Sequence, residues 1–200
     1  MNFVGAAKKA SVEDMEAIAK DLGVETAAFR AVITIEAAGS GFDYMKRPKA
    51  LFERHKFYHQ LQDSPEALKD AVDAGLAYPT WGEKPYPKGS DAVYAEIDHA
   101  VSIAPIPALL STSWGLGQIM GSNFKMAGCE SVEKMVEEAK DSEAGQLRQM
   151  ASYIRSAGLI PALKDKNWAA FARGYNGAGY AQNHYDVKLE AAYKVLTGTA

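Results

Sequence analysis

Glu36 is the residue whose setting most suggests chemistry. It is a lone carboxylate that closes the apolar run of residues 32–36, after Val32, Ile33 and Ile35. Burial of a carboxyl group without a partner disfavours its charged form and raises its pKa. A carboxyl group that stays protonated near neutral pH can act as a general acid, which glycoside cleavage needs at the leaving oxygen. The alternative is a structural Glu36 that faces solvent or pairs with an arginine.

Two glycine-containing segments carry polar and aromatic side chains that suit a carbohydrate. In residues 113–121, Gly115 and Gly117 permit close backbone approach, and Gln118 could hydrogen-bond hydroxyl or acetamido groups. Residues 172–180 combine aromatic rings, which pack on sugar faces, with an amide, which reads hydroxyls. The candidate ligands in this second segment are Arg173, Tyr175, Asn176 and Tyr180. Each segment could instead be a glycine-rich packing helix or turn.

A second carboxylate is expected beside Glu36 in a glycosidase. Residues 41–53 surround a turn-like stretch and predict a short β-hairpin, which would carry Glu53 back towards the C-terminal end of the Glu36 helix. Asp43, on the other arm, is the alternative. The two carboxyl groups would lie about 6.5–9.5 Å apart in an inverting enzyme and about 5–5.5 Å apart in a retaining one. Glu53 could also form a structural ion pair with an arginine.

The rest of the pattern is mostly helical. Ser11 and Asp14 form a capping signal for a helix that should end near Gly23. Residues 79–90 contain three prolines and two glycines and predict a loop, which carries the aromatic residues Trp81 and Tyr86. Further helices are expected at about 25–38, from 64 onwards, and at 90–103, 131–139, 142–157, 167–175 and 181–196.

Composition indicates an ordinary globular protein. The 200 residues fit one domain, and a hydrophobic content of 48% is enough for a sizeable core. The formal net charge of -3 argues against a nucleic-acid binder. The lone Cys129 excludes an internal disulfide and suggests a reducing compartment. No apolar run is long enough for a signal peptide or a membrane span.

A metal site has only a weak signal. His55 and His59 are spaced so that one helix face could present both, with Glu53 nearby. No third ligand is evident, and a surface or packing pair is the simpler interpretation. We therefore expect neither a metal nor a cofactor.

Taken in order, the segments resemble the lysozyme-like superfamily, which includes goose-type lysozymes and lytic transglycosylases. Its pattern is a catalytic Glu at a helix end, then Gly-Leu-x-Gln-Ile/Val-Met, then Tyr-Asn-x-Gly, and the counterparts here are residues 36–39, 115–120 and 175–179. A closer similarity to the N-acetylmuramidase domain of phage endolysins rests on residues 47–55, 113–116 and 168–177. The resemblance covers about residues 11–196. Ala37 stands where relatives commonly have Ser.

The resemblance implies a mainly α, lysozyme-like fold with two lobes and a small β-hairpin beside the active-site cleft. The whole chain would be a single catalytic domain, without a separate wall-binding module. It would hydrolyse the β-1,4 bond between N-acetylmuramic acid and N-acetylglucosamine in bacterial peptidoglycan, with Glu36 and Glu53 as the catalytic pair. The sugar-binding residues would be Gln118, Tyr175, Asn176, Tyr180 and Arg173.

The resemblance also implies a role in host lysis. Such a protein accumulates in the host cytoplasm without a signal peptide and reaches the wall through a holin-made membrane lesion. We expect a monomer that binds the glycan strand, no nucleic acid, and no membrane interior. Two alternatives stay open. A lytic transglycosylase would use one Glu and leave 1,6-anhydro ends, and a wall-binding module would have no catalysis.

Overall fold

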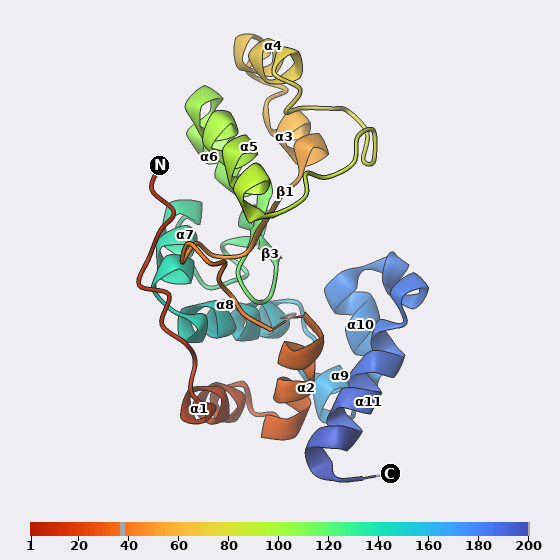
Figure 1. Cartoon of the computed structure of the whole chain (residues 1–200). Helices are drawn as coiled ribbons and strands as arrows, with labels where there is room; N and C mark the ends of the chain where they lie inside the picture. Colours follow the sequence, from red (N-terminus) through yellow and green to blue (C-terminus); the bar gives the residue numbers. More distant parts are fainter. Residues whose placement is uncertain (37–38, 200) are drawn as a thin grey trace.

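The computed structural model describes residues 1–36 and 39–199, and its elements are mostly helices (Figure 1). The α-helices are α1 (Val12–Leu22), α2 (Thr26–Glu36), α3 (Arg54–Gln60), α4 (Pro65–Asp73), α5 (Ser90–Ile103), α6 (Pro105–Leu110), α7 (Val132–Asp141), α8 (Glu143–Ser156), α9 (Ile160–Lys164), α10 (Trp168–Asn176) and α11 (Tyr185–Thr197). The strands are β1 (Ala50–Phe52), β2 (Thr112–Trp114) and β3 (Ile119–Met120). Two 3-10 helices are η1 (Gly121–Asn123) and η2 (Ala178–Asn183). The expected mainly α fold is confirmed.

Local signals in the sequence fix several helix ends. Ser11 caps α1 by accepting a hydrogen bond from the Asp14 amide, while the Asp14 side chain accepts one from the Ser11 amide. Gly23 ends α1 in a left-handed conformation with φ of 73°. Pro65 stands in the first turn of α4, where its missing N–H is harmless. The predicted end of the second helix at residue 38 lies outside the described residues.

The expected hairpin over residues 41–53 is replaced by a sheet with a distant partner. Phe42 and Pro48 form only an isolated antiparallel bridge across a tight turn. β1 instead pairs antiparallel with β2, and β2 pairs antiparallel with β3. The hairpin of the structure is therefore β2–β3, in the glycine-containing segment. A local pattern cannot reveal a pairing between residues about sixty positions apart, which explains the difference.

Three short helices were not predicted from the sequence. α3 and α9 are a few residues long, and helices of this length leave little periodic signal. α5 ends at Ile103, before Pro105, as expected. Pro105 then occupies the first turn of α6, because its fixed φ suits a helix start as well as a helix stop.

Two hydrophobic cores divide the chain into two lobes. The sheet lobe contains β1–β3 and α3–α7, and Phe57 and Trp114 are among its buried side chains. The helical lobe contains α1, α2 and α8–α11, and Phe29 and Phe171 are fully buried in it. The expected two-lobed architecture is thus confirmed. Among the helices of residues 1–36 and 39–199, none is both long and apolar enough to cross a membrane.

Residues 1–10 form a strap that joins the two lobes. Phe3 is buried in the sheet lobe, with its ring centroid 5.5 Å from that of Trp114 and 5.3 Å from that of Tyr94. Further along, the Lys8 amide donates to the Asp141 carbonyl, at the junction of α7 and α8. The Lys8 carbonyl accepts from the amide of Glu143. The N-terminal residues are therefore part of the folded unit.

Replacement of Phe3, the buried residue of the strap, should destabilise the whole fold. We expect Phe3→Ala to lower the free energy of unfolding by about 3 kcal/mol, because it removes a buried ring and leaves a cavity. Urea unfolding measures this change as a lower midpoint at constant slope. The neighbouring Val4 is 43% exposed, so Val4→Ala should change stability by less than about 0.5 kcal/mol. Equal effects of the two variants would contradict the assigned role of the strap.

Candidate active site

Glu36 closes α2 with its carboxyl group half-buried. Phe29 and Val32 on the preceding turns are completely buried, which carries the end of the helix into the interior. The Asn176 side-chain amide donates to Glu36 Oε1 at 3.0 Å. Burial raises the pKa of Glu36, and the hydrogen bond from Asn176 opposes this shift only in part. The burial expected from the sequence is therefore present, and it shifts the Glu36 carboxyl towards its protonated form.

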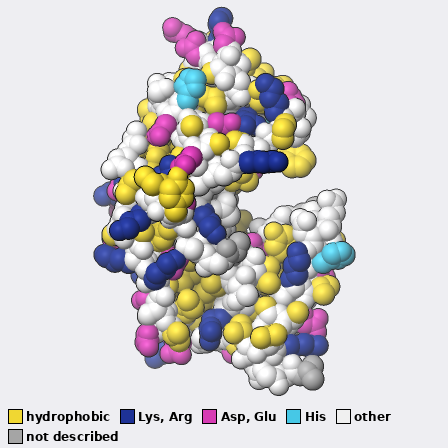
Figure 2. Space-filling view, in the orientation of Figure 1, with side chains coloured by type: hydrophobic (Ala, Val, Ile, Leu, Met, Phe, Trp, Pro, Cys, Tyr) yellow, Lys and Arg dark blue, Asp and Glu magenta, His cyan; other side chains and the backbone are white. Residues whose placement is uncertain are grey.

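A cleft of about 410 Å³ opens in front of Glu36, between the two lobes. In the space-filling view the surface is hollowed between the part that holds α3–α6 and the part that holds α10 and α11 (Figure 2). The cleft is lined by Glu36, Leu51, Glu53, Ser113, Gly117, Gln118, Ile119, Met120, Asn123, Tyr153, Tyr175, Asn176 and Tyr185. Five of the seven site residues predicted from the sequence therefore meet in one cleft.

Glu53 enters the cleft from the sheet lobe. It lies between β1 and α3, and its amide donates to the Ser111 carbonyl at 2.9 Å, which fixes the backbone there. Its Oε2 accepts a hydrogen bond of 2.6 Å from the Tyr86 hydroxyl, and the His55 Nδ1 lies 3.3 Å away. Burial lowers the pKa of His55, although the neighbouring Glu53 charge opposes the shift, so His55 is mostly neutral at pH 7.

The side chain of Asp43, the alternative second carboxylate, is occupied by an ion pair and hydrogen bonds within the protein. Its side chain is 5% exposed and pairs with the Arg47 guanidinium at 2.7 Å. It also accepts hydrogen bonds from the Ser90 hydroxyl and from the amide of Met45. Burial alone would raise the pKa of Asp43, but the bonds from Ser90 and Arg47 hold it below the usual value. Asp43 lines no part of the cleft, so of the two candidate second carboxylates only Glu53 lies there with Glu36.

Tyr175 and Asn176 reach the cleft from the last turn of α10. Tyr175 stacks on the buried Phe171 ring with centroids 5.6 Å apart and donates its hydroxyl proton to the Gly117 carbonyl at 3.1 Å. This bond joins α10 to the turn between β2 and β3. Tyr175 is therefore held by both lobes, while Asn176 beside it contacts Glu36.

Gln118 lines the cleft but uses most of its hydrogen-bonding capacity inside the protein. Its Nε2 donates to the carbonyls of Gly115 and Lys49, and its Oε1 accepts from the Ser113 hydroxyl at 3.0 Å. Gln118 also has a positive φ of 46°, which is unusual for a residue with a side chain. The Gln118 side-chain amide thus joins the β2–β3 turn to Lys49, the residue before β1. One lone pair of Gln118 Oε1 is left for a ligand.

The structure does not bring Arg173 and Tyr180 into the cleft lining. The exposed Arg173 guanidinium lies 5.8 Å from the centroid of the Tyr180 ring, beyond Asn176. Three residues of the lining lie outside every segment that the sequence singled out: Asn123, Tyr153 and Tyr185. They are ordinary helical or turn residues in the sequence, and nothing in their spacing distinguishes them.

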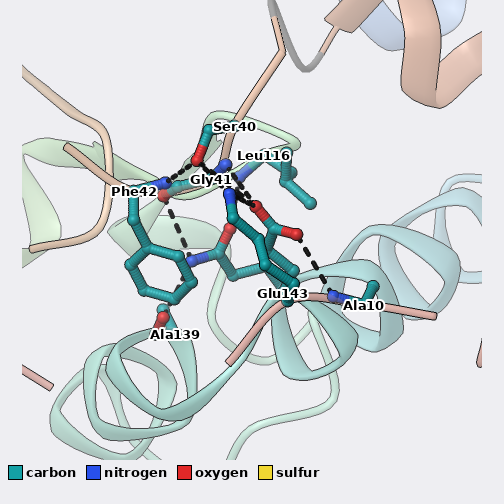
Figure 3. A network of polar contacts seen from close by, with 9 residues as sticks. Ala10, Ser40, Gly41, Phe42, Leu116, Ala139 and Glu143 are labelled. Atoms are coloured by element: carbon teal, nitrogen blue, oxygen red, sulfur yellow. Dashed lines mark hydrogen bonds and ion pairs between the residues drawn. The ribbon is translucent and has the colours of Figure 1, made fainter. Parts of the chain in front are cut away.

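A buried polar network positions the chain that follows Glu36 (Figure 3). Glu143 Oε1 accepts hydrogen bonds from the Gly41 amide and from Lys9 Nζ, and its Oε2 accepts from the Ala10 amide. Gln146, one turn along α8, accepts from the Leu116 amide and donates to the carbonyls of Gly41 and Ala139.

Glycines are required at two positions where the backbone lies against the Gln146 side chain. A Cβ atom on Gly41 would lie 2.1 Å from Gln146 Oε1, and one on Gly115 would lie 2.7 Å from the Gln146 Cδ. Gly115 also has a φ of 70°, which disfavours any side chain. Gly41 and Gly115 therefore make room for one buried glutamine.

Two carboxyl groups from different lobes, one with a pKa raised by burial and one hydrogen-bonded in a polar setting, are what a glycosidase needs. The site and fold are those of a glycoside hydrolase of the lysozyme type. The chain belongs to the N-acetylmuramidase family, whose model matches residues 25–197.

The chain is also similar to a solved structure, the crystal structure of Burkholderia AP3 phage endolysin. The two are 38% identical, with a TM-score of 0.86, and the match covers 96% of this chain and 73% of that one. A comparison with curated proteins finds no match.

The raised pKa of Glu36 has a measurable cost in stability. The native state holds this proton more tightly than the unfolded chain, so ionisation destabilises the fold as the pH rises from 4.5 through the raised pKa. Glu36→Gln removes that ionisation, and we expect its Tm at pH 8 to exceed the wild-type value by roughly 2–4 °C. At pH 4 the difference should vanish, because both side chains are then neutral. A Tm gain independent of pH would refute the assignment.

Proposed function

We propose that this chain hydrolyses the β-1,4 bond between N-acetylmuramic acid and N-acetylglucosamine in peptidoglycan, with Glu36 as the general acid. The observation that carries the proposal is the half-buried Glu36 carboxyl, whose pKa is raised by burial, in the wall of an open cleft that also holds Glu53. Family membership supports the class of bond that is cleaved.

The hydrogen bond from Asn176 assigns the two oxygens of Glu36. Because the Asn176 amide donates to Oε1, the proton of the neutral carboxyl lies on Oε2. Oε2 would then donate this proton to the glycosidic oxygen as the bond to the sugar's anomeric carbon breaks. The resulting carboxylate keeps the Asn176 bond, which becomes charge-assisted and stabilises the transition state.

Glu53 supplies the complementary charge. Its Oε2 is occupied by Tyr86 and His55, and no hydrogen bond to Oε1 is found within the described residues. Oε1 is therefore the oxygen that can take a proton from an attacking water or stabilise the oxocarbenium-like transition state. Tyr175 and Asn176 line the cleft and would bind a sugar beside the bond that breaks, with the Gln118 side-chain carbonyl oxygen as a further acceptor.

The biological setting extends the same proposal. A peptidoglycan hydrolase related to a phage endolysin would lyse the host from within. In this setting the protein would accumulate in the host cytoplasm, reach the wall through a holin-made lesion and act there as a monomer on the glycan strand.

Removal of the acid tests the catalytic role directly. We expect Glu36→Gln to lower the lysis rate by about a thousandfold, because a positioned general acid contributes about 10²–10⁴-fold. Turbidity of outer-membrane-permeabilised cells gives the rate. Glu130 is exposed and lies outside the cleft lining, so Glu130→Gln is the matched control and should keep full activity. Lysis by Glu36→Gln at the wild-type rate would refute the assignment of Glu36 as the general acid.

The products distinguish hydrolysis from transglycosylation. Hydrolysis adds one water to each cut, whereas a lytic transglycosylase uses the sugar's own hydroxyl and leaves a 1,6-anhydro end. The second carboxylate in the cleft favours hydrolysis, so mass spectrometry of digested peptidoglycan should show reducing ends as the main species. Anhydro ends as the main product would overturn the hydrolase assignment while keeping Glu36 as the acid.

A further inference from the structure

Behind Glu53, two side chains of the loop at residues 79–90 form a hydrogen-bonded chain that the mechanism above does not use. The Trp81 indole Nε1 donates to the Tyr86 hydroxyl oxygen at 3.0 Å, and this hydroxyl donates to Glu53 Oε2 at 2.6 Å. The three residues line one hollow of the surface, which adjoins the cleft because Glu53 lines both. The loop is thereby connected to the second carboxylate.

The chemistry of the side chains fixes which group donates in each of these two hydrogen bonds. An indole N–H can only donate, so the Tyr86 oxygen must accept from Trp81. The phenol has a single proton, and that proton is therefore committed to Glu53. Burial and the neighbouring Glu53 raise the pKa of Tyr86 to about 12, so the proton stays in place at neutral pH. The Trp81 N–H thus keeps the Tyr86 oxygen as an acceptor and leaves the Tyr86 proton on Glu53.

The two ends of the chain differ in exposure. Tyr86 is half-buried, and the carbonyl of its neighbour Pro85 accepts a hydrogen bond from Arg54, which is itself ion-paired with Glu96 on α5. Trp81, in contrast, is 67% exposed. An exposed indole offers an apolar face of the kind that packs on a sugar ring, while its N–H faces Tyr86. The loop is therefore anchored at Tyr86 and open to a ligand at Trp81.

We propose that Trp81 and Tyr86 are positioning residues that couple a sugar bound on the Trp81 indole to the orientation of Glu53. The inference rests on the proposed role of Glu53. A sugar ring stacked on the indole fixes the plane of the ring and with it the N–H, so Tyr86 holds the carboxylate with Oε1 towards the cleft. Binding energy from a remote sugar is thereby used at the reacting centre, which raises kcat for strands that reach Trp81.

Conservative variants separate this coupling from simple packing. Tyr86→Phe removes only the donor to Glu53, and Trp81→Phe keeps a flat ring but removes the N–H. On soluble, un-crosslinked glycan strands we expect both to lower kcat about tenfold with little change in KM, because a lost hydrogen bond to a charged group is of that order. Trp81→Ala should raise KM as well, because it also removes the stacking face.

Strand length gives a second readout that a structural role would not move. Wild-type kcat should rise with oligosaccharide length until the strand covers Trp81, and this rise should be lost in Trp81→Phe and Tyr86→Phe. Tyr193→Phe is the matched control, since Tyr193 also donates to a carboxylate, that of Glu25, outside the cleft. It should keep the wild-type kcat and length dependence.

The outcomes separate this inference from the proposed function. Glu53→Gln with full activity would refute the role of Glu53 itself. If Glu53→Gln is inactive while Tyr86→Phe and Trp81→Phe keep wild-type kcat and length dependence, the coupling alone is overturned. Should Tyr86→Phe fail to fold by circular dichroism, Trp81→Phe at the exposed position decides by itself. Tyr86→Phe added to Glu53→Gln should cause no further loss.

Discussion

The geometry of the active site depends on two buried polar side chains of α8, one turn apart. Glu143 and Gln146 together satisfy the backbone of three separate segments: the end of the N-terminal strap, the chain after Glu36, and the β2–β3 turn. Burial opposes the charge of Glu143, but Lys9 and the amides of Gly41 and Ala10 hold its pKa below the usual value. A buried charge that is fully hydrogen-bonded is costly to disturb, so the network fixes these segments against one rigid helix.

The two carboxyl groups of the cleft lie in different environments because different lobes carry them. Glu36 lies at the end of an apolar helix and meets one amide, so burial dominates and favours the neutral acid. Glu53 lies beside a loop and meets a phenol that donates a proton to it. Opposed environments of this kind can separate a general acid from a general base, as the proposed function requires. Because each lobe supplies one group, their relative position depends on the contacts that join the lobes, such as the bond from Tyr175 to Gly117.

Much of the fold and the buried setting of Glu36 could be predicted from the sequence because their signals are local. Ser11 and its capping partner mark the start of a helix, and the apolar residues that precede Glu36 in α2 mark its burial. The pairing of Ala50 with Trp114 could not be predicted, because it joins segments far apart in the chain. The same limit applies to Tyr86, whose sequence setting indicates a loop aromatic but not its bond to Glu53, and to Gln118, whose amide serves the backbone rather than a free site.

The strap of residues 1–10 changes where the folded unit begins. The family match starts at residue 25, yet Phe3 fills the sheet-lobe core and the chain then crosses to the start of α8. The terminal amine lies 3.9 Å from Asp98 on α5, in the sheet lobe. A partner protein fused to residue 1 would therefore be attached to the sheet lobe rather than to the lobe that carries Glu36. Strain from such a fusion would act on Phe3 and on the contacts that join the lobes. A flexible linker at this end would therefore preserve the geometry of the cleft.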